Sequence, residues 1–285
     1  MQMLKLLPIL LCVFVVGCSQ HHRAKFEDFP LANYKIDHAE KQLAIKRFST
    51  ILLKRELTQE QTAEILFRRG LLYQQVGLFH LAFFDLLKTI KLKPDFVEAY
   101  NLLGVYYVNQ QEYEQAYNAF DTVIELDDKH EFAYFNRALA LFYNDRADLA
   151  LIDFKQFYGF NSEDGYRLIW LYFAKLANQT EEESLTFLNQ KSDQITDNWT
   201  RLLVQLFQHK ITPEKLIESA ALNNKDINQY NERLCEAYFY IAKYLQQQNQ
   251  IAKARFYFTA AISTQVYEFV EYKYAKLELA QLNKE

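Results

Sequence analysis

A period of 34 residues constrains the fold of this chain more than any other feature of its sequence. Small residues recur at two positions of the period: Gly70, Gly104 and Ala138 at one, and Ala82, Ala116 and Ala150 at the other. Large apolar residues recur at three further positions, in the sets Tyr73, Tyr107 and Leu141; Leu66, Tyr100 and Tyr134; and Leu86, Phe120 and Phe154. A unit of this length accommodates two helices, and its small residues let the two approach closely. Because one helix pair cannot bury its apolar face alone, neighbouring pairs are expected to stack.

A 34-residue helix pair of this kind is typical of tetratricopeptide repeats, and we expect an all-α solenoid of about 14 helices. Its expected parts are three regular repeats at 63–96, 97–130 and 131–164 (together 63–164), degenerate helical pairs over 165–234, a further repeat at 235–268 and a closing helix within 269–285. The closing helix is expected to shield the last open face of the solenoid, with its charged residues Glu271, Lys273, Lys276 and Glu278 in solvent.

The composition excludes several alternatives to a helical repeat. The chain has 285 residues but only six Gly and four Pro, too few for the frequent turns of a many-stranded β architecture. The glycines also stand too far apart to form a phosphate-binding loop. A formal net charge of −4 and a pI near 5.9 give no electrostatic drive toward nucleic acid or anionic lipid.

The N-terminus has the pattern of an export signal. Lys5 precedes an apolar run from Leu6 to Val16, which is too short to span a bilayer comfortably. A buried core helix is the alternative interpretation. The segment Val15-Val16-Gly17-Cys18 resembles the lipobox of bacterial lipoproteins, which implies a signal peptide at 1–17 and lipid attachment to Cys18. Acyl chains of this kind would hold the chain durably at a membrane, and residues 18–37 would form the tether.

Few residues of the sequence are arranged for catalysis or metal binding. His21 and His22 are adjacent but lack a third ligand, so a solvated linker is favoured over a metal site. Cys235 is either a catalytic thiol or a small core residue, and the core is favoured because no suitable His lies near it. We therefore expect no metal, no cofactor and no catalytic residues, with an enzyme whose site is hidden from sequence as the alternative.

The first helix of each repeat is expected to line a concave surface that binds peptide or protein. Its inward positions are Glu64, Phe67, Leu71 and Gln74; Glu98, Asn101, Val105 and Val108; and Phe132, Phe135, Leu139 and Phe142. This surface is mainly apolar and has almost no basic residues, unlike tetratricopeptide domains that bind an acidic C-terminus. Among these positions, Phe67, Leu71, Asn101, Val105, Val108, Phe135, Leu139 and Phe142 are the candidate partner-binding residues. The alternative is that some of them pack against a superhelix that closes on itself or against the extra N-terminal helix.

A further amphipathic helix is expected over 38–56, within an N-terminal segment 38–62. Its apolar residues Phe48, Ile51 and Leu52 lie on one face, which would dock on a second copy of the chain or on its own first repeat. The segments Thr58-x-x-Gln61 and Thr180-x-x-Glu183 are expected capping boxes at helix N-termini.

The order of these parts resembles one family closely. The resemblance rests on the lipobox, the lone helix, the repeats, and the segments Arg69-Gly70-x-Leu72-Tyr73, Leu103-Gly104-x-Tyr106, Glu112 to Phe120 and Glu125-Leu126-Asp127. Together they are similar to the NlpI family of outer-membrane tetratricopeptide-repeat lipoproteins. This resemblance implies a homodimeric, non-catalytic periplasmic adaptor that binds a Prc-type protease and peptidoglycan hydrolases such as a MepS-type endopeptidase. A passive scaffold for peptidoglycan enzymes is the alternative function.

Overall fold

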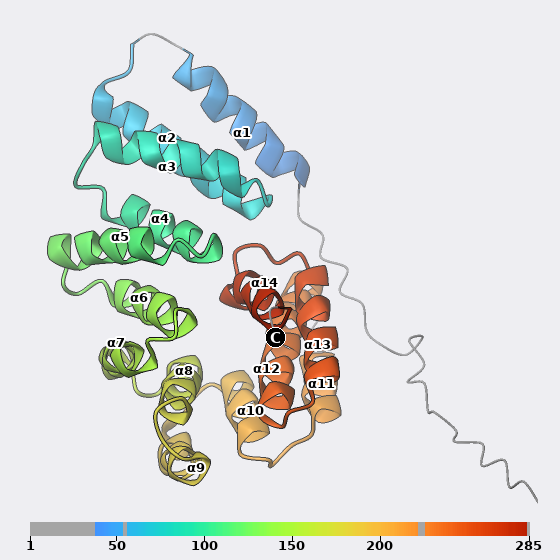
Figure 1. Ribbon diagram of the computed structural model, residues 1–285. Coiled ribbons are helices and arrows are strands. Elements are labelled where there is room, and N and C mark those ends of the chain that lie inside the picture. The colour runs from blue at the N-terminus through green and yellow to red at the C-terminus, as the bar shows by residue number, and fades with distance from the viewer. Residues whose placement is uncertain (1–37, 54–55, 222–225, 284–285) are drawn as a thin grey trace, which may run out of the picture. The chain divides into compact units, whose positions relative to one another are not determined.

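The computed structural model describes residues 38–53, 56–221 and 226–283, which belong to one compact unit, Leu31–Glu285 (Figure 1). The described residues form an all-α fold, as expected, with no strand among them. In chain order the helices are α1 His38–Leu52, α2 Gln59–Gln75, α3 Phe79–Leu92, α4 Val97–Asn109, α5 Tyr113–Leu126, α6 Glu131–Tyr143, α7 Ala147–Phe160, α8 Gly165–Leu176, α9 Glu181–Lys191, the short 3₁₀ helix η2 Ser192–Gln194, α10 Asn198–Phe207, α11 Pro213–Ala221, α12 Ile227–Gln247, α13 Ile251–Ser263 and α14 Val270–Leu282. The signal peptide, Cys18 and the tether lie outside the described residues.

Side-chain caps fix where two of these helices begin, as the sequence predicts. The Thr58 hydroxyl accepts a hydrogen bond from the Gln61 backbone amide, and the Gln61 side chain accepts one from the Thr58 amide. Thr180 and Glu183 form the same reciprocal arrangement at the start of α9. Each box satisfies backbone amides that have no partner within the helix.

The close approach of helices within a repeat depends on glycine. A Cβ atom built on Gly104 of α4 would lie only 2.4 Å from the Phe120 ring of α5. Phe120 is fully buried, so the ring occupies the space that a side chain at position 104 would need. This contact explains physically why the 34-residue period places a small residue opposite a large one.

A buried ion pair repeats in the first and third repeats. Arg69 of α2 donates two hydrogen bonds of 2.7 Å to the Asp85 carboxylate of α3. Arg137 of α6 binds Asp153 of α7 in the same way, at 2.7 and 2.8 Å, two periods further along the chain. The second repeat has Leu and Ala at the corresponding positions. Both aspartates are nearly buried, so each pair holds its two helices in register.

The N-terminal helix lies against the chain's own first repeat. α1 runs beside α2 (Figure 1), and the Ser49 hydroxyl accepts a hydrogen bond of 3.0 Å from Arg69. α1 ends at Leu52, four residues before the expected end at 56. Phe48, Ile51 and Leu52 are half-buried in this arrangement, so part of their surface remains available.

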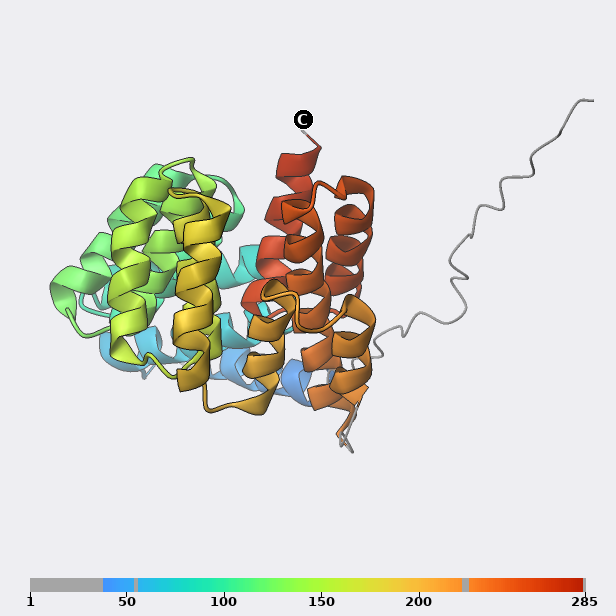
Figure 2. The ribbon, with the colours of Figure 1, turned by 90° about the horizontal axis from the view of Figure 1, so that it is seen from below.

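The C-terminal part of the chain differs from the expected arrangement. α12 begins at Ile227, eight residues before the predicted start of the last repeat, with the Asp226 side chain capping it. α14 does not face solvent as a polar closing helix. It lies with α12 on the inner side of the stacked pairs α2 to α9 (Figures 1 and 2), and Glu271 and Glu278 are only 6% and 1% exposed. The prediction that these two carboxyls are solvated is therefore wrong.

Specific contacts hold α14 in this position. The Tyr143 ring of α6 stacks on Tyr274 of α14, with 5.0 Å between ring centroids. Glu278 accepts hydrogen bonds from the Tyr143 hydroxyl at 2.8 Å and from Lys243 Nζ of α12 at 2.6 Å. The solenoid therefore curves back on its own C-terminal helices, which was the alternative to an open groove.

Candidate functional site

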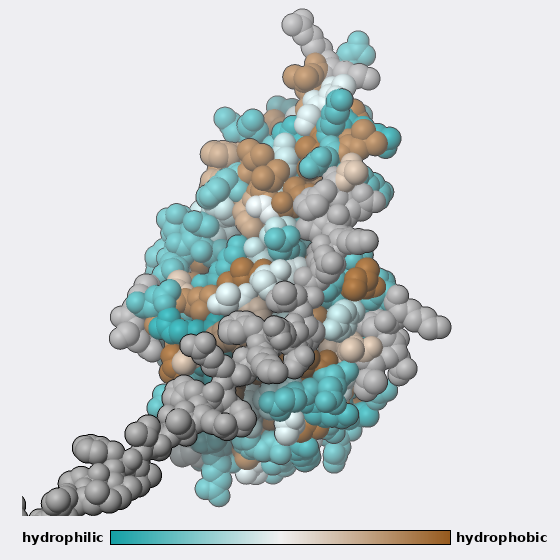
Figure 3. Space-filling view, turned by 90° about the vertical axis from the view of Figure 1, so that its right-hand side faces the viewer, coloured by the Kyte–Doolittle hydropathy of each residue, from teal (hydrophilic) through white to brown (hydrophobic). Residues whose placement is uncertain are grey.

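The site most suited to binding is the space between the first repeats and the C-terminal helices. We call this space the inner groove: it lies between the inner faces of α2, α4, α6 and α8 on one side and helices α12 and α14 on the other. On the side of the molecule seen in Figure 3, the visible described residues include several apolar patches between hydrophilic ones.

The eight predicted partner-binding residues divide by exposure. Those that keep part of their surface are Phe67, Leu71, Asn101, Val105 and Phe142. Phe135 is 6% exposed, and Val108 and Leu139 are fully buried. The assignment of Val108 and Leu139 to the groove surface is therefore wrong, because a side chain without exposed surface cannot contact a partner. Both belong to the core of the solenoid.

Several of the remaining residues also contact their neighbours in the solenoid. Phe67 packs against Phe96, with 4.6 Å between ring centroids. The Asn101 side-chain oxygen accepts a hydrogen bond of 2.9 Å from Asn136. Val105, by contrast, faces a cleft of the inner groove.

This first cleft lies between α3, α4 and α14 and has a volume of about 150 Å³. Its walls are mainly apolar, with Phe79, Phe83, Val105 and Leu277 among them. Lys273 and Lys276 of α14 also line it, and no acidic residue does so among the described residues. We call it the lysine cleft. The expectation that the groove has almost no basic residues holds for the repeat helices but not for the assembled surface.

A second cleft, of about 360 Å³, lies where α6 and α8 face α12 and α14. Its aromatic walls include Phe135, Phe157, Tyr166 and Trp170. Ionised and ionisable side chains also line this cleft, namely Asp164, Arg167, Glu236, Glu268 and Glu271. We call it the aromatic cleft.

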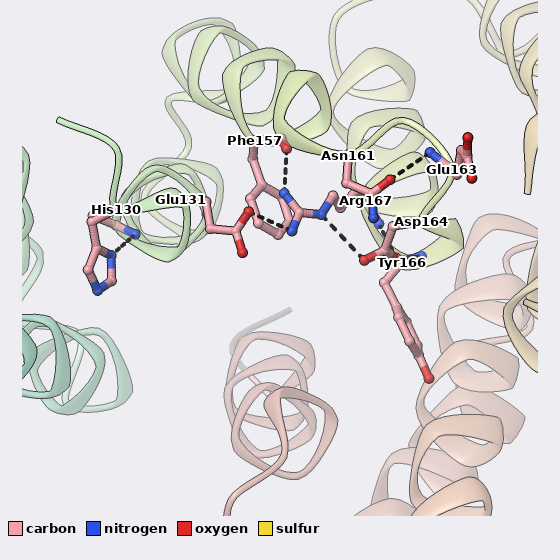
Figure 4. Close-up of polar contacts among 9 residues, drawn as sticks. His130, Glu131, Phe157, Asn161, Glu163, Asp164, Tyr166 and Arg167 are labelled. Atoms are coloured by element: carbon pink, nitrogen blue, oxygen red, sulfur yellow. Dashed lines mark hydrogen bonds and ion pairs between the residues drawn. The ribbon is translucent and has the colours of Figure 1, made fainter. Parts of the chain in front are cut away.

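Arg167 anchors one wall of the aromatic cleft (Figure 4). Its guanidinium donates hydrogen bonds to Glu131 at 2.8 Å, to Asp164 at 3.3 Å and to the Phe157 carbonyl oxygen at 2.9 Å. It also lies 4.1 Å from the centroid of the Phe157 ring. These contacts join α6, α7 and α8, and they neutralise the cation where it is nearly buried.

Tyr166 connects this wall to two buried carboxyls of the C-terminal helices. The Tyr166 hydroxyl donates a hydrogen bond of 2.7 Å to Glu236 of α12, and the Trp199 indole NH of α10 donates to the same carboxyl. Glu271 of α14 accepts a hydrogen bond of 3.0 Å from Tyr240. Burial and the neighbouring Glu271 raise the pKa of Glu236 to about 8, and burial also raises the pKa of Glu271. The pair therefore retains a proton at neutral pH.

A third cleft, of about 450 Å³, lies between α6, α8, α12 and the C-terminal half of α14. Lys243 and Glu278 line it together with Phe142 and Phe173. The Lys243 ammonium lies 5.8 and 5.5 Å from the centroids of these two aromatic rings. Because this ammonium is already bonded to Glu278, the arrangement fixes α12 and α14 to the groove rather than offering a free charge.

The sequence does not indicate that charged residues line the clefts: Glu271, Lys273 and Lys276 were expected in solvent on a closing helix, and Lys243 and Glu236 were not predicted to have a role. Lys243, Lys273, Lys276, Glu236 and Glu271 lie on α12 and α14, more than 90 residues after the repeat helices α2, α4 and α6 that they face. The 34-residue period does not link them to those helices. The signal that could have identified them is the placement of charged residues on helices whose other faces are apolar and aromatic.

Cys235 is not placed for chemistry. It is fully buried, its sulfur lies 3.7 Å from the Ala261 carbonyl oxygen, and burial raises the pKa of its thiol well above the usual value. It is therefore a core residue. Within the described ranges, no three His, Cys, Asp or Glu side chains are grouped so that they could bind a metal ion. None of the described helices is both long and apolar enough to cross a bilayer.

Comparisons with known proteins agree with this architecture. The family model of the tetratricopeptide repeat matches residues 97–130, the range of the second predicted repeat. A lipoprotein NlpI homologue from Haemophilus influenzae is 36% identical over 245 residues, which cover 86% of this chain and 78% of that protein. The crystal structure of a tetratricopeptide repeat protein from Parabacteroides merdae superposes with a TM-score of 0.57, at 16% identity, over 87% of this chain and 94% of that one. The similarity to this solved structure concerns the fold alone.

Proposed function

Because this chain belongs to the NlpI family of lipoproteins, we propose that it is a non-catalytic adaptor at the periplasmic side of the outer membrane. It binds a Prc-type protease and peptidoglycan hydrolases, among them a MepS-type endopeptidase. By delivering the hydrolase to the protease it promotes hydrolase degradation and so regulates growth and division of the cell wall.

The observation that carries this proposal is the inner groove. Although α14 occupies its centre, the groove keeps three clefts with aromatic and apolar walls. Aromatic side chains that are partly exposed in concave surfaces are typical anchors for protein partners. Phe67, Leu71, Asn101, Val105 and Phe142 are the predicted partner-binding residues that remain accessible there.

An adaptor of this kind acts through effective concentration. Two clients bound to one rigid solenoid meet in an effectively intramolecular encounter, which raises the rate of their reaction without any catalytic group on the solenoid. The repeated Arg–Asp pairs and the buried Glu278 contacts supply the rigidity that keeps the distance between two bound clients constant.

The decisive experiment is a reconstituted degradation assay. The lipid-free chain from Ser19 is mixed with the Prc-type protease and the MepS-type endopeptidase of its host, and the loss of endopeptidase is followed with and without the chain. We expect a several-fold acceleration. If both proteins bind but degradation is not accelerated, a passive scaffold replaces the delivery function, and if neither binds, the adaptor proposal is wrong.

We propose that the adaptor is held at the membrane through lipid on Cys18. Three acyl chains would anchor it durably, whereas one would bind only marginally. Replacing Cys18 by Ser should release the protein from the outer-membrane fraction, and mass spectrometry of the wild-type N-terminal peptide should show the lipid. A wild-type chain that fractionates without the membrane would contradict the anchor.

We further propose that α1 forms the contact with a second copy. Phe48, Ile51 and Leu52 are half-buried by the chain's own first repeat, whereas Leu43 on the same helix is 48% exposed and Leu53, directly after its end, is 83% exposed. A second copy would cover this remaining apolar surface.

Sedimentation equilibrium tests the dimer. Phe48→Glu should shift the wild-type dimer toward monomer, whereas Thr50→Glu, at an exposed position of the same helix, should not. A wild-type chain that sediments as a monomer at all concentrations would contradict the proposal.

A further inference from the structure

The lysine cleft combines apolar walls with positive charge, and none of the described residues that line it is acidic. Among the residues that line it, Lys273 and Lys276 carry charge, whereas the others are apolar, aromatic or amide side chains such as Gln74 and Asn109. This excess of positive charge is confined to the cleft, whereas the chain as a whole has a net charge of −4.

Lys276 provides the more available of the two ammonium groups. Its Nζ lies 4.4 Å from the centroid of the Tyr272 ring and 5.4 Å from that of Phe79, and no carboxylate of the described residues forms an ion pair with it. Burial lowers its pKa, as expected for an ammonium without a counter-ion. Lys273 donates a hydrogen bond of 2.9 Å to the Glu268 carbonyl oxygen, and the nearby Glu268 and Glu271 carboxyls offset part of its charge, so Lys276 is the better candidate for binding an anion.

The apolar part of the cleft fits one side chain. Its volume of about 150 Å³ is close to that of a protein cavity that binds benzene. Phe83 and Tyr106 form a rigid wall, since their rings stack with 4.3 Å between centroids and the Tyr106 hydroxyl is hydrogen-bonded to His80 at 2.8 Å. Val105 and Leu277 close the cleft from α4 and α14.

We propose that the lysine cleft binds the C-terminal residue of a partner protein, with its apolar side chain between Phe83, Val105 and Leu277 and its terminal carboxylate on Lys276. A carboxylate at a chain end is the one anion that every protein presents next to a side chain, and its capture is an established mode of peptide recognition. The amide side chains of Gln74 and Asn109 lie at the same cleft to meet the polar backbone of the preceding residues. This inference rests on the proposed adaptor function and specifies the chemistry of one client.

The probes are fluorescein-labelled octapeptides Ser-Gly-Ser-Gly-Ser-Ala-Ala followed by Leu, Phe, Asp or Lys, each made with a free C-terminal carboxylate and as the C-terminal amide. Fluorescence anisotropy is measured with the lipid-free full chain from Ser19. We expect binding of the Leu and Phe peptides with a free carboxylate, and affinity lower by about tenfold or more for their amides, because a charge-assisted hydrogen bond is lost.

Two variants and a control assign the binding to the cleft. Lys276→Met keeps the aliphatic stem between the rings and should lower affinity for the free-acid peptides by about tenfold. Val105→Glu places a competing carboxylate in the cleft and should abolish binding. Lys253→Met removes an exposed lysine of α13, whose Nζ bonds only to Gln250 among the described residues, and should bind as the wild type does. Circular dichroism confirms the fold of each variant.

Equal binding of acids and amides, wild-type affinity in Lys276→Met, or no binding of any peptide would overturn the proposal. Binding of octanoate but of no peptide would also overturn it, in favour of a fatty-acid site. The degradation assay separates this inference from the proposed function. If the wild type accelerates degradation but binds no peptide through its carboxylate, only the proposal that the lysine cleft binds a C-terminal residue is refuted. If it binds peptides through their carboxylate but does not accelerate degradation, only the proposal that it delivers the hydrolase to the protease is refuted.

Discussion

The buried pair Glu236 and Glu271 makes the stability of this fold depend on pH in a direction opposite to that of most salt-bridged carboxylates. Replacing Glu236 by Gln tests this. A glutamine oxygen still accepts a hydrogen bond from Trp199 or Tyr166, but the side chain cannot ionise beside Glu271. The substitution therefore removes one of the two ionisable groups of the pair and keeps the shape of the side chain.

The magnitude follows from the pKa of Glu236. In the unfolded chain a glutamate titrates at about 4.3, whereas in the native state the pKa of Glu236 is raised to about 8. Between these values the native state holds a proton that the unfolded state has released, so the free energy of unfolding falls as pH rises. At about 1.4 kcal/mol per pH unit, the loss between pH 5 and pH 8 is about 4 kcal/mol.

The assay compares thermal unfolding midpoints of wild type and Glu236→Gln from pH 5 to pH 8.5. Because the glutamine NH₂ group faces one of the two donors, a pH-independent offset is expected; relative to wild type, the midpoint of the variant should rise by roughly 8 °C between pH 5 and pH 8, at about 2 °C per kcal/mol for a chain of this size. Glu125→Gln, an exposed position on α5, serves as the control and should follow the wild type at every pH. A difference between wild type and Glu236→Gln that does not change with pH would refute the reasoning.

Three further substitutions test the packing of the repeats and the groove. Gly104→Ala should destabilise the fold by about 1–3 kcal/mol in urea unfolding, because its Cβ would overlap the Phe120 ring, and adding Phe120→Leu should restore part of this loss. Arg137→Met should cost about 3 kcal/mol by leaving Asp153 buried without its partner, and unchanged unfolding would show that the pair contributes no stability. Leu71→Glu should weaken client binding in a pull-down while circular dichroism stays unchanged, and loss of helical signal would instead place Leu71 in the core.

The repeat architecture is readable from the sequence because its determinants are local. Gly104 and Phe120 lie within one 34-residue unit, and the contact between them is the same kind of contact that the period encodes in each repeat. Helix starts at Thr58 and Thr180 are likewise set by residues three positions apart. Interactions over such short separations leave a repeating pattern in the sequence, which is why the all-α solenoid could be predicted.

The site depends instead on contacts between distant parts of the chain. No pattern in the sequence places Glu278 beside Tyr143, 135 residues earlier, or brings Lys276 into a cleft with Phe79. For this reason α14, whose charges suggest a solvated end, was expected outside the groove rather than within it.

The sequence by itself determined the helical repeat, the family and the apolar character of the inward positions, since these depend on periodic and local residues. Only the tertiary structure decided which of those positions stay accessible, because packing between helices buries Val108. It also decided which charged residues lie beside them, because Lys276 lines the cleft only when the solenoid curves back on its last helix. The burial of a residue and the position of the last helix both depend on the assembled core, in which the apolar face of each helix packs against other helices.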